Sequence, residues 1–168
     1  MKIFPLVSVL LICALFFVGS AQARNAVHAL AGRYDQHHSS GFVGNPETYG
    51  VDDVAEIVPA GKDAAYFRVS LHFYNGHNCG IWGIANVEDG KLVYHDPTPS
   101  YSVARQCVLR LSHDGKYLKI DDEDGSCKMY CGLRGGLTDV RVPFSSRESI
   151  RYMARLKSSR QYQDAVKE

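Results

Sequence analysis

The chain has almost no excess of charge of either sign. It carries 19 basic and 18 acidic side chains in 168 residues, and loss of Lys2 with the N-terminal segment described below leaves 18 of each. A protein that binds nucleic acid along its surface needs an excess of lysine and arginine to neutralise the phosphates. The composition therefore excludes nucleic acid as the expected partner.

The sequence also lacks an activated nucleophile and a set of metal ligands. No Gly-x-Ser-x-Gly motif is present, which excludes the nucleophile elbow of many serine hydrolases. The neighbours His37 and His38 would point to opposite faces of a strand. His72 and His77 flank a turn without further zinc ligands at a compatible spacing. We therefore expect no catalytic residue, no metal and no cofactor, and hence a protein that is not an enzyme.

An acidic run at 121–124, followed by Gly125, resembles the start of a calcium-binding loop. The glutamate that an EF-hand places about six residues after this glycine is absent. Nor does the run suit a glycosidase, because its catalytic carboxylates flank the scissile bond and usually come from separate elements that line a cleft. The run predicts a solvated turn or a loop that faces a partner.

The apolar run at residues 3–18 is about 16 residues long, shorter than the roughly 20 that a membrane-spanning helix needs. Lys2 precedes it, and Ala21-Gln22-Ala23 follows as a cleavage-site pattern. These features predict a secretory signal peptide over residues 1–23, a mature chain that starts at Arg24, and a periplasmic or secreted protein.

Four cysteines follow the predicted signal peptide: Cys79, Cys107, Cys127 and Cys131. An even number of cysteines in an exported chain indicates disulfides, here two. Four cysteines allow three pairings. We favour Cys79–Cys107, which would join two strands, and Cys127–Cys131, which would close the turn before Gly132.

Apolar and polar residues alternate through the middle of the chain. The odd-numbered positions from Ala65 to Phe73 are apolar, which predicts a strand with one buried face. The pairs Asn75-Gly76, Asp89-Gly90 and Asp114-Gly115 mark turns between successive strands. No helical segment separates the strands, which excludes a parallel α/β sheet. The predicted fold class is mainly β, an antiparallel meander that closes as a small barrel or a two-layer sandwich.

Two further expectations concern the strands themselves. A first strand starts at Gly32 and is broken at His37, residues 42–52 form a long loop with glycine and proline, and a second strand covers 54–59. Gly83 is small within its strand, which suits the close approach of a neighbouring strand.

The C-terminal segment changes to a helical period. Ser145 and Glu148 form a capping-box pattern, which predicts the start of a helix. Ser158-Ser159 can cap a second short helix. The predicted domains are a disulfide-bonded β domain at 24–144 and a C-terminal helical appendix at 145–168.

One resemblance rests on a framework of cysteines and glycines together with a C-terminal segment. The residues are Asn78-Cys79-Gly80, Gly83, Ala85, Gly90, Leu92, Tyr94, Cys107, Leu109, Asp122, Gly125, Cys127, Cys131-Gly132, Arg134-Gly135, Ile150-Arg151-Tyr152, Ala154-Arg155-Leu156-Lys157 and Ser159. The pattern, over residues 64–162, resembles a group of small exported bacterial proteins, some of them grouped with lysozyme-inhibitor-like proteins. The resemblance implies a binding protein and carries over no inhibitory residue.

Export, two disulfides, the absence of a catalytic set and the resemblance together predict a protein that inhibits a cell-wall hydrolase or neutralises an effector toxin. The partner-binding loops would be 121–134 and 75–78. The candidate contact residues are His77, Asp121, Asp122, Asp124, Tyr130 and Arg134.

Two alternatives remain open. Phe67 and Phe73 point inward and could line a cavity for a small apolar ligand, although filling the core is the simpler interpretation. The basic residues Arg147, Arg151 and Arg155 would lie on one helical face, which could contact a membrane or simply be solvated.

Overall fold

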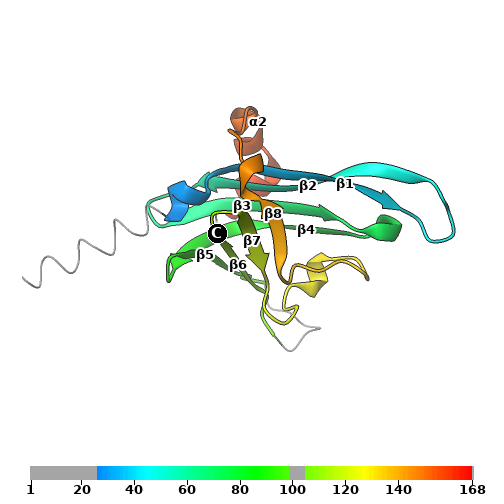
Figure 1. The fold of residues 1–168 in the computed structure, drawn as a ribbon. Helices are drawn as coiled ribbons and strands as arrows, with labels where there is room; N and C mark the ends of the chain where they lie inside the picture. Colours follow the sequence, from blue (N-terminus) through cyan, green and yellow to red (C-terminus); the bar gives the residue numbers. More distant parts are fainter. Residues whose placement is uncertain (1–25, 99–104, 168) are drawn as a thin grey trace, which may run out of the picture.

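A computed structural model describes residues 26–98 and 105–167 (Figure 1). The predicted signal peptide, residues 1–23, lies outside the described residues. Eight strands follow one another, each antiparallel to the next. They are β1 (Gly32–Gly41), β2 (Thr48–Pro59), β3 (Ala64–His72), β4 (Asn78–Glu88), β5 (Lys91–His95), β6 (Val108–His113), β7 (Tyr117–Asp121) and β8 (Val140–Pro143). The prediction of an antiparallel meander is confirmed.

The eight strands curl into a nearly closed barrel. Beyond β8 the chain runs back along β1, where Arg33 and Glu148 form a two-way backbone bridge. The Arg33 N–H donates to the Glu148 carbonyl at 2.9 Å, and the Glu148 N–H donates to the Arg33 carbonyl at 2.8 Å. This bridge covers part of the hydrogen-bonding edge of β1 that an open sheet would leave exposed.

The first two strands are longer than predicted, and the expected break at His37 is wrong. β1 continues to Gly41 and β2 starts at Thr48, so the connection is shorter than the expected loop over 42–52. The extension consists of polar pairs: His37 Nδ1 lies 2.8 Å from Asp52 Oδ1, and His38 Nε2 lies 3.2 Å from Asp53 Oδ2. Because these residues lack an apolar alternation, the hydrophobic pattern does not reveal them as strand.

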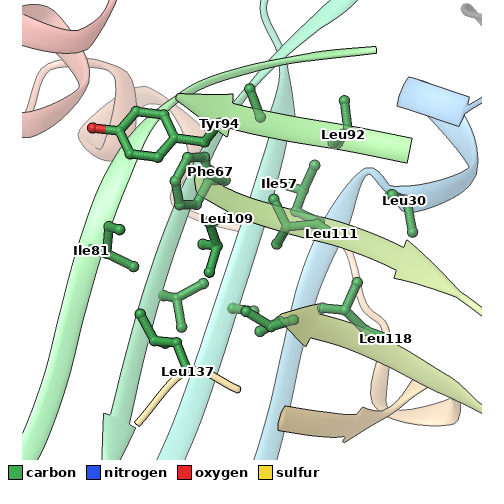
Figure 2. Packing of buried hydrophobic residues seen from close by; sticks show 14 of the residues in the cluster. Leu30, Ile57, Phe67, Ile81, Leu92, Tyr94, Leu109, Leu111, Leu118 and Leu137 are labelled. Atoms are coloured by element: carbon green, nitrogen blue, oxygen red, sulfur yellow. The ribbon is translucent and has the colours of Figure 1, made fainter. Parts of the chain in front are cut away.

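The barrel interior is filled by side chains from every strand, and Figure 2 shows part of this packing. Phe67 is fully buried and meets Tyr94 edge to face, with ring centroids 5.1 Å apart. Leu109, Leu111 and Leu118 are also fully buried. Phe67 therefore fills the core, which is the simpler of the two interpretations of the inward-facing aromatic residues.

The two ends of the barrel differ in the length of the connections that they carry. In a meander, successive connections emerge at opposite ends, so alternate connections share an end. Those after β2, β4 and β6 are short, at 60–63, 89–90 and 114–116. Those after β1, β3, β5 and β7 are longer, at 42–47, 73–77, 96–107 and 122–139. We call the end that carries these four longer connections the loop end; it includes the 3₁₀ turns η1 (Tyr74–Gly76) and η2 (Lys128–Tyr130).

The C-terminal segment starts without the predicted helix. The 3₁₀ turn η3 (Phe144–Ser146) follows β8, and α2 (Met153–Lys157) begins later. The capping-box prediction at Ser145 is wrong, because Glu148 is held in the bridge to β1 and cannot adopt helical geometry there. In contrast, Ser159 caps α3 (Arg160–Ala165), where its Oγ accepts from the Tyr162 N–H at 3.3 Å.

The two helices pack against the outer face of the sheet, above β2 to β4 (Figure 1). Leu156 and Ala165 are buried there against Val58 and Tyr66. Since Arg147 lies outside α2, the three arginines do not share one helical face. Within the described residues, no helix is both long and apolar enough to cross a membrane.

Candidate functional site

Two disulfides fasten the loop end. Cys79 pairs with Cys131 and Cys107 pairs with Cys127, with Cα atoms 4.0 and 4.5 Å apart. The predicted pairing is wrong, because the 122–139 connection folds back so that each of its two cysteines meets a strand of the barrel. The two bridges indicate a non-reducing environment for the protein.

Asp122 anchors the same connection from within. Its side chain is buried, with Oδ2 accepting from the Cys127 N–H at 3.0 Å and Oδ1 accepting from Thr138 Oγ1 at 2.6 Å. A buried carboxylate that is fully hydrogen-bonded stabilises the loop around it. Asp122, one of the predicted contact residues, therefore has no surface to offer a partner.

The other two acidic candidates differ in exposure. Asp121 Oδ1 accepts from the Asp139 N–H at 3.1 Å, which joins the start of the 122–139 connection to its end. Asp124 is exposed, and its carboxylate lies 3.0 Å from Arg105 Nη1. The acidic run is thus largely occupied by hydrogen bonds and an ion pair with its own loop end, which leaves it little free negative charge.

Lys128 fixes the protruding turn that follows η2. Its ammonium donates to the carbonyls of Gly132 at 3.3 Å, Leu133 at 2.9 Å and Gly135. The turn presents Leu133, whose side chain is 83% exposed. Beside it, Arg134 is exposed and forms no ion pair with any described residue. The result is a shaped turn with an apolar tip and an uncompensated positive charge.

The two predicted loops are brought together. The Gly132 N–H donates to the Asn78 carbonyl at 2.7 Å, next to the disulfide. A Cβ on Gly132 would come within 2.9 Å of His77 Nδ1, so a larger residue would have to displace the His77 side chain. Tyr130 is partly buried, and its hydroxyl donates to the buried Asp96. Of the six predicted contact residues, Arg134 and Asp124 are the most accessible.

The sequence reasoning missed a group of exposed apolar side chains that we call the apolar rim. Among the described residues, seven large hydrophobic side chains are exposed, and all but Val166 lie at the loop end. The six of the apolar rim are Phe42, Val43, Tyr49, Tyr74, Met129 and Leu133. One sequence feature could have indicated this rim: the apolar pair Phe42-Val43 lies inside a segment that is otherwise rich in turn residues.

Contacts between the connections hold the apolar rim in place. The rings of Phe42 and Tyr49 lie 5.5 Å apart, and the Tyr74 hydroxyl donates to the Phe42 carbonyl at 3.0 Å. The ring of Phe73 in turn lies against Gly135 of the protruding turn. The β1–β2 hairpin, η1 and the 122–139 connection therefore support one another.

Within residues 26–98 and 105–167, no group of three or more His, Cys, Asp or Glu side chains is arranged to hold a metal ion. Comparison with protein families, curated proteins and solved structures found no match for this chain. We therefore infer the function from the geometry of the loop end.

Proposed function

We propose that this protein is exported to the periplasm or secreted and acts as a binding protein whose loop end docks on another protein, a cell-wall hydrolase or an effector toxin. The observation that carries the proposal is the apolar rim. Six of the seven exposed large hydrophobic side chains among the described residues gather at the loop end, where two disulfides fasten the 122–139 connection to the barrel.

Exposing apolar surface to water costs free energy. Single exposed hydrophobic residues are ordinary on a soluble protein, but a group of them in one region is typical of an interaction site. Aromatic side chains such as Tyr49 and Tyr74 are also frequent energetic centres of protein interfaces. Because the disulfides and Lys128 already order the loop end, little conformational entropy would be lost on binding.

The choice of partner rests on charge complementarity and on the resemblance described above. A glycan-cleaving hydrolase carries a pair of carboxyl groups in an open cleft. The protruding turn offers a matching shape, with Leu133 as an apolar tip and Arg134 as a cation free of ion pairs. This revises the sequence-based expectation, because Arg134 rather than the acidic run becomes the main electrostatic contact.

The test uses the oxidised chain without residues 1–23, a lysozyme and a cell-wall N-acetylglucosaminidase. Clearing of a cell-wall suspension measures inhibition, and calorimetry measures binding. We expect inhibition of at least one enzyme. Leu133→Asp and Arg134→Glu should each weaken binding by at least about tenfold, equal to about 1.4 kcal/mol.

Matched controls are available outside the loop end, in the C-terminal segment. Among the described residues, Val166 is the exposed large hydrophobic residue outside the apolar rim, and Arg151 is an exposed arginine. Val166→Asp and Arg151→Glu should bind like the unmodified protein. Unchanged lysis by both enzymes, or equal losses in the controls and in the loop-end variants, would contradict the proposal.

A further inference from the structure

A hollow in the outer wall of the barrel arises from two neighbouring rows of side chains across β1 to β4. One row contains large residues in register: Arg33, Glu56, Arg68 and Trp82. The adjacent row on the same face contains smaller ones: Val54, Ser70 and Gly80. The step in side-chain size leaves a hollow of about 450 Å³, within the range of small-molecule sites, roughly 300–1,000 Å³.

The C-terminal segment forms the remaining wall of this hollow. Tyr152 and Gln161 line it from above the sheet, and Trp82 lines it from β4. Gln161 Oε1 accepts from Arg68 Nη1 at 3.4 Å. The site thus combines one large aromatic ring with several planar polar groups. A smaller hollow of about 300 Å³ adjoins it and shares Arg68 and Tyr152.

Charge balance limits the kind of ligand. Arg68 donates through Nε to the buried carboxylate of Glu56 at 2.6 Å. Arg33 lies 3.2 Å from Asp35 and 3.3 Å from Glu148. Each cation of the wall therefore has a carboxylate partner, and the hollow has no spare positive charge for an anion. It favours a neutral ligand with many hydrogen-bonding groups.

We infer that this hollow binds a neutral sugar ring of a glycan. The C–H face of a pyranose packs on an aromatic ring such as Trp82, and its hydroxyls both donate and accept hydrogen bonds. Arg68 supplies donors, whereas Ser70 and Gln161 supply both donors and acceptors. The site lies on the barrel wall, whereas the apolar rim lies at the strand ends. The inference is therefore independent of the proposed docking function.

Trp82 is the single tryptophan of the chain, so its fluorescence reports directly on the hollow. The probes are the trimer of N-acetylglucosamine and cellotriose, with sodium acetate and sodium phosphate as anions, and calorimetry as a second readout. We expect a saturable change with at least one sugar, with a dissociation constant of about millimolar order, unaffected by added salt. A saturable change with the anions alone, or with no probe, would overturn the inference.

Gly80 offers a variant that blocks the hollow without disturbing the fold. A Cβ at Gly80 would meet no atom within 4 Å, and its φ is not in the left-handed region. Gly80→Val should therefore fold, because valine suits a strand, and weaken sugar binding by at least about tenfold. Gly136 is equally unobstructed, so Gly136→Val serves as the matched control and should bind sugar normally.

A second variant, Gln161→Ala, keeps the test informative if Gly80→Val does not fold. It removes one polar group of the wall and should also weaken sugar binding. Unchanged sugar binding in a folded Gly80→Val protein would overturn the inference. Hydrolase inhibition should be unaffected in Gly80→Val and lost in Leu133→Asp, so failure of one proposal is distinguishable from failure of the other.

Discussion

Gly83 lies directly beneath the ring of Tyr94. A Cβ at this position would come within 2.4 Å of the Tyr94 ring, which is itself packed against Phe67. Because both rings are buried and packed against each other in the core, we expect Gly83→Ala to lower the free energy of unfolding by about 1–3 kcal/mol. Guanidinium unfolding measures this, with Gly80→Ala as the control. Equal stabilities would show that the ring can shift.

Tyr66 is a buried residue with an unsatisfied polar atom. Its side chain is 0% exposed, and its hydroxyl has no hydrogen-bond partner among the described residues. An unpaired buried polar group is costly, so Tyr66→Phe should raise the free energy of unfolding, by about 1 kcal/mol. A loss of stability in denaturant unfolding would indicate that the hydroxyl has a partner after all.

The burial of Tyr66 also makes the stability of the fold depend on pH. Burial is the main cause that raises the pKa of Tyr66 from 10.0 to about 12. As the pH rises above 10, Tyr66 ionises in the unfolded chain before it ionises in the folded protein, so stability falls between pH 10 and about 12. Tyr66→Phe should lose less stability over this window in unfolding measurements at several pH values. If the unmodified protein and Tyr66→Phe lost stability equally as the pH rises, Tyr66 would not be the cause.

At the scale of elements, the turn between β6 and β7 depends on Asp114. Its Oδ1 accepts from the Tyr117 N–H at 2.8 Å and the Lys116 N–H at 2.9 Å, with Lys119 nearby. These hydrogen bonds lower the pKa of Asp114 from 3.8 to about 2. The stabilisation is therefore complete above pH 3.8 and is lost as the pH falls through about 2.

The acid titration of Asp114 can be followed by NMR of its side-chain carboxyl carbon, which should show a midpoint near pH 2. In Lys119→Met the midpoint should rise only slightly, because the backbone N–H groups contribute most. In Asp114→Asn the turn should keep its shape and lose this pH dependence. A midpoint close to 3.8 would mean that the hydrogen bonds do not form in solution.

Some strands and turns could be predicted from the sequence, and others could not. The strand that contains Phe67 alternates clearly because one face is buried, and the Asn75-Gly76 and Asp89-Gly90 turns need the positive φ values that those residues adopt. The extended hairpin around His37 has polar residues on both faces, so no alternation marks it. At Ser145 a local helix signal was overridden by pairing between Glu148 and β1, which local sequence does not encode.

At the scale of the whole molecule, the meander itself builds the candidate site. Alternate connections must emerge at one end, so the four longer ones, far apart in sequence, gather there. The sequence could therefore indicate which loops are long, and the structure places the predicted loops 75–78 and 121–134 in contact. It could not show that Asp122 is buried or that Phe42 and Met129 belong to the same end, because both depend on how the chain folds back.

The disulfide pairing is the clearest test of that long-range arrangement. Peptide mapping without reduction should recover Cys79 linked to Cys131 and Cys107 linked to Cys127, and any peptide joining Cys79 to Cys107 would contradict the fold of the loop end. The bridges span 52 and 20 residues. On chain-entropy grounds, replacing each pair by serine should lower the free energy of unfolding by about 4 and about 3 kcal/mol respectively.

The two bridges should also differ in function. Cys79–Cys131 lies next to the protruding turn, whereas Cys107–Cys127 lies near the base of the 122–139 connection. Loss of the first should weaken the proposed hydrolase binding at temperatures where the protein remains folded, because the turn must then be ordered on binding. The second pair of serines provides the matched control. Equal binding by both double variants would show that Lys128 and the Gly132–Asn78 hydrogen bond suffice to hold the turn.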